Sequence, residues 1–363
     1  MKRVVLAAGG TGGHFYPGLS AAKALRARGW EPLLVVRSGD PALARLEAEG
    51  IAALPVDLRG LPRRPGPELL AFARRLAGSL GLLSRALRAF SPDLALGMGG
   101  YLTFPLAYAA RRRGVPLAVH ESNAVLGLAN RAAAFLGAEL FWGLPPADPA
   151  AGGALVGTPV RPELWSRRAA DDARRALGLA ADRTTVLVFG GSQGARALNA
   201  SLPRALKPLG PAVQVLHLAG KGKAEEARAA YAAAGVAADV RDYLEDMAAA
   251  YGAADLVVCR SGASTLAELA AQRAPAVLVP YPHATAGHQD VNARVFERAG
   301  AAVRLPEGEL APRLGGVLAD LLQSTRADGR RAEMARAYDR LGLPPAERTA
   351  DVLADRLEAL RAR

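Results

Sequence analysis

The chain has 363 residues, of which 51% are hydrophobic, and it carries a formal net charge of +12 at pH 7. This length allows two domains with substantial cores, and the apolar content excludes an intrinsically disordered chain. The single cysteine, Cys259, excludes disulfides within the chain and cysteine-based metal clusters, and it fits a reducing cytoplasm. No uncharged apolar run reaches the roughly 18 residues that a membrane-spanning helix needs, so no such helix is predicted.

Much of the positive charge lies in one part of the chain. Between Leu58 and Arg113 there are ten arginines and only two acidic residues, Glu68 and Asp93. Such a region calls for an acidic partner or surface. Aromatic residues do not alternate with these arginines as they do on faces that bind single-stranded nucleic acid, so nucleic acid is not predicted as a partner.

The N-terminal segment has the pattern of a strand, a glycine loop and a helix. The apolar run Arg3–Ala7 leads into Gly-Gly-Thr-Gly-Gly-His at Gly9–His14, and a helical pattern then continues to a stop at Gly29. Glycines let backbone N–H groups approach an anion, and a helix N-terminus adds a positive dipole end. The dinucleotide fingerprint fails, because Phe15 stands where its last glycine belongs. The segment therefore predicts an anion site, or else a tight turn without a ligand, with His14 as a candidate acid or base.

The same pattern recurs along the chain and predicts an α/β fold of two Rossmann-like, doubly wound domains. Sheets of this kind bind ligands at the carboxyl ends of their strands, so two of them facing each other would share a cleft there. The Gly- and Pro-rich stretch 152–162 is the predicted linker. We expect domains at 1–160 and 161–345, with the amphipathic helix 346–363 as a candidate to pack back on the first. The predicted strands are Arg3–Ala7, Pro32–Val36, Asp93–Gly97, Leu117–His120, Glu139–Trp142, Thr184–Phe189, Val213–Leu218, Asp255–Cys259 and Ala276–Pro280.

A second glycine loop, Gly-Gly-Ser-Gln-Gly at 190–194, is compatible with two rival chemistries. It matches the Gly-x-Ser-x-Gly nucleophile elbow of hydrolases, for which Ser192 would be the nucleophile and Asp255 and His283 the nominal partners. It also matches a phosphate-binding turn, although it lacks the lysine of a Walker loop. The motif alone does not decide between them, and a plain tight turn is the third interpretation.

A third turn of small residues, Arg260–Glu268, follows the predicted strand that ends at Cys259. Ser264 or Thr265 is expected to cap a helix here, with Glu268 completing a capping box from Thr265. Glu268 would then lie one turn into the helix, where it could accept both hydroxyls of a ribose. The turns at 190–194 and 260–268 are both suited to bind an anion and follow adjacent strands. Such a pair suits a diphosphate ligand better than an ester substrate.

Further polar residues follow the ends of other predicted strands. His283 and His288 lie in an irregular loop without helical pairing, so no metal site is predicted there. Gln289 and Asn292 carry both donors and acceptors, which suits sugar hydroxyls. His-Glu-Ser-Asn at 120–123 places four polar groups at the end of another strand.

The segment Glu68–Phe90 predicts a long amphipathic helix with arginines beside its apolar stripe. It is either an ordinary helix packed on the sheet or a basic helix that contacts anionic lipid. The apolar stripe is Leu69, Phe72, Leu76, Leu80, Leu83, Leu87 and Phe90, and the arginines are Arg74, Arg75, Arg85 and Arg88.

Taken in order, these motifs resemble those of the MurG family, the UDP-N-acetylglucosamine–N-acetylmuramyl-(pentapeptide) pyrophosphoryl-undecaprenol N-acetylglucosamine transferases. The resemblance covers nearly the whole chain. A large number of long motifs in the same order is specific for this family. Ser122 departs from the His-Glu-Gln-Asn usual in the family, and Ala284–Gly287 lacks the acidic residues often found there. The motifs are GGTGGH at 9, LGMGGY at 96, HESN at 120, GTPVR at 157, GGSQGARALN at 190 and DMAAAY…AADLVVCRSGASTLAE from 246 to 268.

The resemblance implies the two-domain GT-B fold, with no required metal or cofactor, and a place on the cytoplasmic face of the plasma membrane as a peripheral protein. It implies inverting transfer of GlcNAc from UDP-GlcNAc to the 4-hydroxyl of the muramoyl sugar of lipid I, which gives lipid II. The first domain would bind the acceptor and an anionic membrane surface, and the second would bind the donor. A serine hydrolase, and an NADP-binding reductase that uses Arg37, remain alternatives.

Residue roles carry over from the resemblance at the matching positions. His14 would be the general base, kept neutral by the helix N-terminus, with Glu121 as its rival. Ser192 and the turn Ala263–Glu268 would hold the donor's diphosphate and ribose, and the Leu244 backbone the uracil. The donor residues implied are Thr11, Gly12, Gly13, Asn123, Arg161, Ser192, Leu244, Ala263, Ser264, Thr265, Leu266, Ala267, Glu268 and Gln289. The residues implied for the acceptor diphosphate are Thr11, Gly12, Gly13, Gly99, Gly100 and Tyr101.

Overall fold

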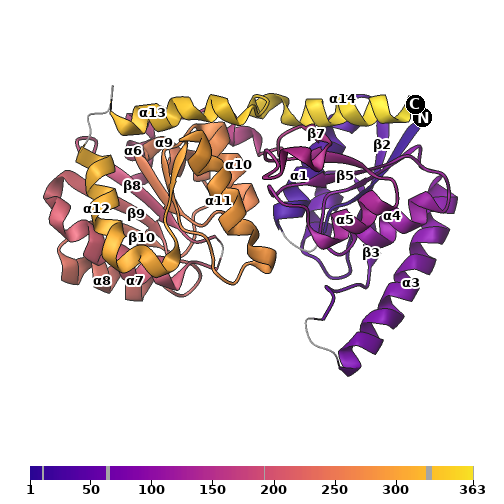
Figure 1. The fold of residues 1–363 in the computed structure, drawn as a ribbon, viewed down its shortest axis with the longest axis horizontal. Coiled ribbons are helices and arrows are strands. Elements are labelled where there is room, and N and C mark those ends of the chain that lie inside the picture. Colours follow the sequence, from indigo (N-terminus) through magenta and orange to yellow (C-terminus); the bar gives the residue numbers. More distant parts are fainter. Residues whose placement is uncertain (10–11, 63–65, 192, 324–328, 363) are drawn as a thin grey trace. The chain divides into compact units, whose positions relative to one another are not determined.

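The computed structural model describes residues 1–9, 12–62, 66–191, 193–323 and 329–362 (Figure 1). The chain forms two compact units. Unit 1 comprises Met1–Arg161 with Leu343–Arg363, and unit 2 comprises Pro162–Gly342. Each unit is built on a parallel sheet, which confirms the predicted α/β class of two doubly wound domains. Among the described residues, no helix has the length and apolar character needed to cross a membrane.

Unit 1 is organised around a seven-stranded parallel sheet with the order β3-β2-β1-β4-β5-β6-β7. Its inner strand β1 is buried from Val4 to Ala7, as expected for a strand covered on both faces. Helix α1 packs closely against the end of this strand: a Cβ added at Gly18 would lie only 2.4 Å from the Cβ of Ala8, the residue that follows β1. The strands are β1 Lys2–Ala7, β2 Trp30–Arg37, β3 Ala52–Val56, β4 Leu94–Gly97, β5 Leu117–Glu121, β6 Glu139–Trp142 and β7 Ala154–Leu155; the helices are α1 Gly12–Ala27, α2 Ala42–Ala48, α3 Pro67–Phe90, α4 Thr103–Arg111, α5 Leu128–Phe135 and α14 Thr349–Arg361.

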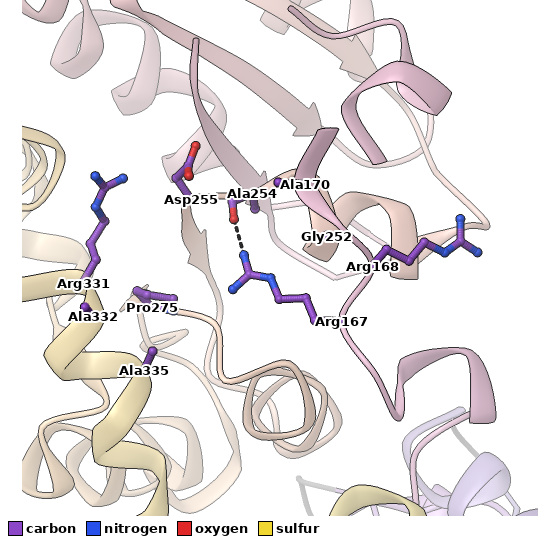
Figure 2. Close-up of a pocket in the computed structure, with 10 residues that line it drawn as sticks. All are labelled: Arg167, Arg168, Ala170, Gly252, Ala254, Asp255, Pro275, Arg331, Ala332 and Ala335. Atoms are coloured by element: carbon purple, nitrogen blue, oxygen red, sulfur yellow. Dashed lines mark hydrogen bonds between the residues drawn. The ribbon is translucent and has the colours of Figure 1, made fainter. Parts of the chain in front are cut away.

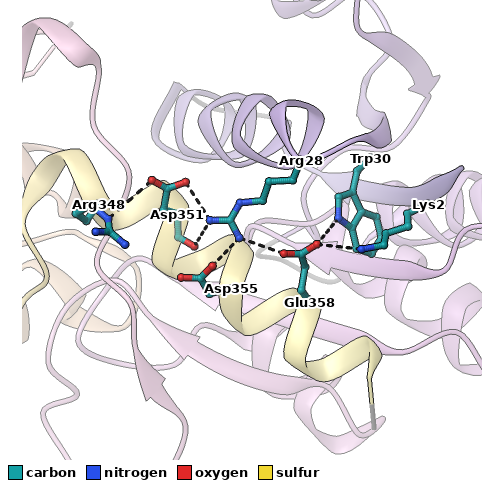
Figure 3. Close-up of polar contacts among 7 residues, drawn as sticks. All are labelled: Lys2, Arg28, Trp30, Arg348, Asp351, Asp355 and Glu358. Atoms are coloured by element: carbon teal, nitrogen blue, oxygen red, sulfur yellow. Dashed lines mark hydrogen bonds and ion pairs between the residues drawn. The ribbon is translucent and has the colours of Figure 1, made fainter.

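The C-terminal helix α14 is part of unit 1 and packs against α1 (Figure 1). Arg28, just past the end of α1, donates hydrogen bonds to Asp351 at 3.1 Å, Asp355 at 2.6 Å and Glu358 at 3.2 Å (Figure 3). Glu358 also accepts the indole N–H of Trp30 at 2.9 Å. One arginine therefore joins three successive turns of the last helix to the first helix. The α14 residues that join the apolar core are Leu353, Ala354 and Leu357.

Unit 2 repeats the plan with a six-stranded parallel sheet of order β10-β9-β8-β11-β12-β13. Its two central strands, β8 and β11, are almost wholly buried. The strands are β8 Thr184–Phe189, β9 Val213–Leu218, β10 Ala237–Arg241, β11 Leu256–Cys259, β12 Ala276–Leu278 and β13 Ala302–Arg304; the helices are α6 Ala170–Leu177, α7 Arg196–Leu206, α8 Ala224–Ala234, α9 Met247–Ala253, α10 Ala263–Gln272, α11 His288–Ala299, α12 Leu310–Gln323 and α13 Arg330–Ala337.

All nine strands expected from the sequence occur, with ends that differ by at most two residues. The four strands that were not expected, β3, β7, β10 and β13, are the outer strands of the two sheets. They are short and partly exposed, so they lack the continuous apolar run that marks a buried parallel strand. Strand β3 even contains Pro55, which an outer strand tolerates.

Candidate active site

In unit 1, three loops meet at the carboxyl ends of adjacent strands β1, β4 and β5. The loop after β1 leads into α1, which begins at Gly12, so His14 lies in the first turn of a helix as expected. Gly12 and Gly13 open this helix, and the orphan N–H groups of such a turn attract negative charge. Thr11, expected at the same site, lies outside the described residues.

The imidazole of His14 lies against the loop that follows β4. A Cβ added at Gly99 would be 3.1 Å from the His14 Nε2, and one added at Gly100 would be 3.3 Å from its Nδ1. Both glycines have positive φ angles, +93° and +74°, so their conformation and the nearby ring each disfavour a side chain. Burial lowers the pKa of His14 and outweighs the charge of Glu121, which raises it. The imidazole is therefore neutral at neutral pH.

The carboxylate of Glu121 is held by four hydrogen bonds. Its Oε1 accepts the backbone N–H of Asn123 at 3.0 Å and the Asn123 amide at 2.9 Å. Its Oε2 accepts the backbone N–H of Gly127 and the Asn130 amide, both at 2.9 Å. Glu121 is only 4% exposed. Protonation at either oxygen would weaken two of these bonds, so the geometry suits an anchor of the β5–α5 loop better than a base.

The neighbours of Glu121 are also engaged within unit 1. His120 is fully buried, and its Nε2 lies 2.9 Å from the Gly157 carbonyl. Burial lowers the pKa of His120, so the neutral ring donates this bond. The Ser122 hydroxyl lies 3.4 Å from the other ring nitrogen, Nδ1. Of the four polar residues at 120–123, Asn123 is the one that is not fully buried.

Thr103 is a site residue that the sequence analysis did not identify. Its hydroxyl accepts the backbone N–H of Gly99 at 3.0 Å and donates to the Gly99 carbonyl at 2.9 Å. It therefore fixes the glycine pair that borders His14. The signal was a threonine at the start of α4, where hydroxyl residues favour helix N-termini. Tyr101, in the same loop, is half-buried.

In unit 2, the turn after β11 departs from its expected capping. Helix α10 begins at Ala263 with Gly262 as its N-cap, and no side chain caps it. The expectation that Ser264 or Thr265 caps the helix is therefore wrong. Gly262 adopts the extended conformation that an N-cap needs (φ −67°, ψ 144°), so the helix starts earlier. The two hydroxyls lie instead within its first turn, half-buried beside the orphan N–H groups.

Glu268 lies one turn further along α10 and is half-buried. One of its oxygens, Oε2, accepts the hydroxyl of Tyr251 from α9 at 2.9 Å. Burial, followed by the Glu268 charge, raises the pKa of Tyr251 well above its usual value, so this hydroxyl remains a neutral donor. The carboxylate is thus oriented by a rigid, buried tyrosine.

The start of helix α11 joins the loop after β12 to the loop after β11. The Ser261 hydroxyl donates to the Gln289 carbonyl at 2.7 Å, and the Asn292 amide donates to the Ser261 carbonyl at 3.1 Å. The Gln289 side chain accepts the Tyr281 N–H at 3.0 Å. Asn292 is fully buried, so it serves the fold rather than a sugar. Gln289 is half-buried and retains its amide donors.

The hydrolase alternative requires Asp255 beside the loop that contains Ser192. Ser192 itself lies outside the described residues, but its loop follows Phe189 at the carboxyl end of β8. Asp255 accepts the Thr185 N–H at 2.8 Å. Thr185 precedes Phe189 by four residues on β8, which places it about 13 Å from the carboxyl end of that strand. It also forms a 2.6 Å ion pair with Arg174. Because Asp255 lies at the opposite end of the sheet, the triad is not assembled and the hydrolase interpretation is wrong.

A cavity of about 500 Å³ lies at this amino-terminal end of the unit 2 sheet, next to Asp255 (Figure 2). Two of its three arginines, Arg167 and Arg168, are engaged with the surrounding structure. Arg167 donates to the Tyr251 carbonyl at 3.3 Å and to the Ala254 carbonyl, and Arg168 pairs with Asp246 at 2.8 Å. We assign this cavity a structural role, because doubly wound sheets bind ligands at their carboxyl ends.

Two expected donor residues, Leu244 and Arg161, are half-buried. Leu244 follows β10 at the carboxyl end of the unit 2 sheet, and Arg161 closes the first segment of unit 1. Among the residues that the structure describes, no group of His, Cys, Asp and Glu side chains could hold a metal ion.

Comparison with protein families places both units in one class of enzyme. Residues 4–139 match the glycosyltransferase family 28 N-terminal domain, and residues 185–349 match the family 28 C-terminal domain.

A protein from Elusimicrobium minutum is 37% identical, and the match covers 99% of this chain and 100% of that protein. A protein from Halorhodospira halophila is 45% identical, and the match covers 94% of this chain and 95% of that protein. Both are described as UDP-N-acetylglucosamine--N-acetylmuramyl-(pentapeptide) pyrophosphoryl-undecaprenol N-acetylglucosamine transferases. The crystal structure of Acinetobacter baumannii MurG superposes with a TM-score of 0.80 at 30% identity, over 98% of this chain and 100% of that one.

Proposed function

Because the chain belongs to the family of UDP-N-acetylglucosamine--N-acetylmuramyl-(pentapeptide) pyrophosphoryl-undecaprenol N-acetylglucosamine transferases, we propose how its two units divide that reaction. The chain is an N-acetylglucosaminyltransferase that takes GlcNAc from UDP-GlcNAc and passes it to lipid I, giving lipid II. The acceptor is the 4-hydroxyl of the muramoyl sugar, and the configuration at the anomeric carbon inverts.

The observation that carries the mechanism is the neutral, half-buried His14 at the start of α1. In the reaction the acceptor oxygen forms a bond to the anomeric carbon while the bond from that carbon to the UDP oxygen breaks. The hydroxyl proton passes to an imidazole nitrogen of His14, and UDP departs with the bonding electrons. His14 is the better base of the two candidates, because Glu121 is buried and already accepts four hydrogen bonds.

Unit 1 binds the acceptor. The first turn of α1, at Gly12 and Gly13, offers backbone N–H groups and a positive dipole end to the acceptor diphosphate. Gly99 and Gly100 border the imidazole ring of His14. The backbone of these two glycines therefore lies where the acceptor head group reaches the base. Thr11 and Tyr101 complete the proposed acceptor site.

Unit 2 binds the donor. Ser192 and the first turn of α10 hold the diphosphate, where the Ser264 and Thr265 hydroxyls lie beside unsatisfied N–H groups. Glu268, oriented by Tyr251, accepts the ribose hydroxyls. The Leu244 backbone binds the uracil, and the amides of Gln289 and Asn123 contact GlcNAc. The remaining donor residues proposed in unit 2 are Ala263, Leu266 and Ala267. Those proposed from unit 1 are Asn123, Thr11, Gly12, Gly13 and Arg161.

Helix α3 forms the membrane contact of unit 1, with exposed apolar residues at its start and arginines along its length. The start extends away from the sheet (Figure 1), and its Leu69 and Leu70 are 45% and 60% exposed. The second half of α3 packs on the unit, with Leu83 and Leu87 fully buried. Basic, partly apolar surfaces bind anionic lipid. The site of action is then the cytoplasmic face of the membrane, where the arginines Arg74, Arg75, Arg85 and Arg88 would face anionic lipid.

The decisive experiment incubates the full chain with radiolabelled UDP-GlcNAc and a lipid I analogue. We expect label in a lipid product and release of UDP in equal amounts. Label that is released as free GlcNAc at the same rate without the acceptor would contradict the transferase mechanism.

A further inference from the structure

Three neighbouring loops of unit 2 are joined at the carboxyl end of its sheet. They follow β8, β9 and β10, which are adjacent strands. The loop after β8 carries the glycine motif at 190–194, and the loop after β10 leads to Leu244. The loop between them, 219–223, contains Lys223, which the resemblance to known transferases did not single out.

Asp242 fixes the middle loop from one side. Its carboxylate accepts the backbone N–H groups of Gly222 at 2.9 Å, Lys223 at 3.1 Å and Ala224 at 2.9 Å. These groups open helix α8, whose N-cap residue offers no side-chain cap of its own. Asp242 therefore caps α8 from the next loop, and these bonds lower the pKa of Asp242.

Lys223 fixes the glycine loop from the other side. Its Nζ donates to the Gln193 carbonyl at 2.6 Å. The two loops also touch backbone to backbone, since a Cβ added at Gly194 would lie 1.9 Å from the Ala219 carbonyl oxygen. Gly194 and Gly220 both have positive φ angles, so this close approach depends on glycine in both loops.

We propose that Lys223 is a positioning residue for the donor diphosphate, which it serves by holding the glycine loop and placing a positive charge beside it. The proposal rests on the proposed function, which puts the diphosphate at Ser192, the residue before Gln193. An ammonium group has three donors, and the Gln193 carbonyl takes one of them. The charge stabilises UDP as it leaves, as any fixed cation near a departing diphosphate does.

The contacts from Asp242 through Lys223 to Gln193 also predict which part of the donor needs Lys223 for binding. Lys223 contacts the diphosphate loop, whereas the uracil and ribose would be bound at Leu244 and Glu268. Loss of the ammonium should therefore weaken UDP binding and leave uridine binding unchanged. A merely structural lysine would affect both ligands equally.

The test measures binding of UDP and of uridine to the full chain by calorimetry. For Lys223→Met we expect about tenfold weaker UDP binding and unchanged uridine binding, because a hydrogen bond to a charged group is lost. Lys223→Arg should restore UDP affinity, and the KM for UDP-GlcNAc should follow the same order while the acceptor KM stays constant. The control is Lys207→Met, which removes an exposed lysine at the far end of α7, about 16 Å from the loop.

The outcomes separate this proposal from the proposed function. If the unaltered chain binds no UDP, the donor assignment of unit 2 fails. If it binds UDP and Lys223→Met binds UDP equally well, the role of Lys223 fails while the donor assignment stands. Equal weakening of UDP and uridine would likewise overturn the role in diphosphate positioning. Matching thermal unfolding of the variants shows that the fold is intact.

Discussion

Glu268 and Tyr251 lie 2.9 Å apart, oxygen to oxygen, and they join α10 to α9. The tyrosine is fully buried and donates to a carboxylate that is only half-buried. The hydrogen bond therefore orients the carboxylate that we assign to the donor ribose. Two variants therefore test two different effects. Substitution of Glu268 removes the carboxylate, and substitution of Tyr251 removes only the hydrogen bond that orients it.

Glu268→Ala should weaken UDP-GlcNAc binding and leave acceptor binding unchanged. Loss of hydrogen bonds to a charged group costs roughly 1.5–3 kcal/mol, or about ten- to a hundredfold in affinity. Tyr251→Phe should have a smaller effect in the same direction, because the carboxylate stays but loses its orienting donor. Calorimetry with UDP measures both, and the exposed Glu226→Ala is the matched control. An unchanged UDP affinity in Glu268→Ala would contradict the ribose role.

Membrane binding should depend on the arginines along α3 and on the exposed leucines at its start. Each arginine near an anionic leaflet contributes about 1 kcal/mol, which salt screens. Replacing Arg74, Arg75, Arg85 and Arg88 by Gln should thus reduce sedimentation with anionic liposomes, most strongly at low salt.

Replacement of the exposed Leu69 and Leu70 by Ser should also reduce this sedimentation, but the loss should persist at high salt, because apolar burial is not screened. The leucine variant should keep its thermal stability, since these leucines are exposed in the unit. If sedimentation is unaltered in both variants, α3 serves only to pack on its own sheet.

His217 should make unit 2 less stable as the pH falls. Its ring is fully buried, 2.9 Å from the Tyr231 hydroxyl and 3.1 Å from the Asn199 side-chain oxygen. Burial lowers the pKa of His217 to about 4, whereas an unfolded histidine titrates near 6.5. Between these values the unfolded chain binds more protons, so stability falls with pH, by up to about 3 kcal/mol in total.

His217→Gln removes this contribution. We expect the variant to be less stable than the unaltered chain at pH 7, with a difference that shrinks as the pH falls from 6.5 to 4. Urea unfolding at several pH values measures it. Comparison at each pH also cancels the acid sensitivity of His14 and His120, whose pKa values burial lowers too. A difference that stays constant with pH would show that His217 is not held neutral.

The parts of the fold that could be predicted from the sequence are those marked by a pattern within a short stretch of chain. Central strands such as Thr184–Phe189 were found because burial on both faces requires a continuous apolar run. Outer strands such as Ala302–Arg304 were missed because three residues, of which only the first is buried, carry no such signal. The glycine loops and the place of His14 in the first turn of α1 were also predictable, since strand, glycines and helix are adjacent in sequence.

The rest of the site depends on contacts between residues far apart in the chain. No local pattern indicates that Tyr251 orients Glu268, or that Asp255 is held by Arg174 at the wrong end of the sheet for a triad. The same is true of Lys223, whose partner Gln193 is 30 residues away. Even the helix start at Ala263 was misplaced, because a glycine N-cap competes with the hydroxyl residues that follow it.

The roles of Glu121 and His14 separate in their pH profiles. Glu121→Gln replaces one acceptor oxygen by an amide that faces other donors, so the β5–α5 loop should loosen and the thermal midpoint should fall. If Glu121 is an anchor, kcat should decline only with this loss of order. The acidic limb of the kcat profile should persist and shift to lower pH, because the Glu121 charge no longer raises the pKa of His14. A vanished acidic limb in Glu121→Gln would identify Glu121 as the base.

His14→Ala should lower kcat by about 10²–10⁴-fold, the usual contribution of a positioned general base, and leave both substrate affinities largely unchanged. In the unaltered enzyme, kcat should fall as the pH drops through the pKa of His14, because an imidazolium cannot accept the proton of the acceptor hydroxyl. Burial lowers this pKa below the usual 6.5, so the midpoint of the fall should lie on the acidic side of that value. The limb should disappear in His14→Ala, which a pH series of kcat under saturating substrates measures. If acceptor KM rises instead and kcat falls less than tenfold, His14 orients the acceptor diphosphate and another group takes the proton.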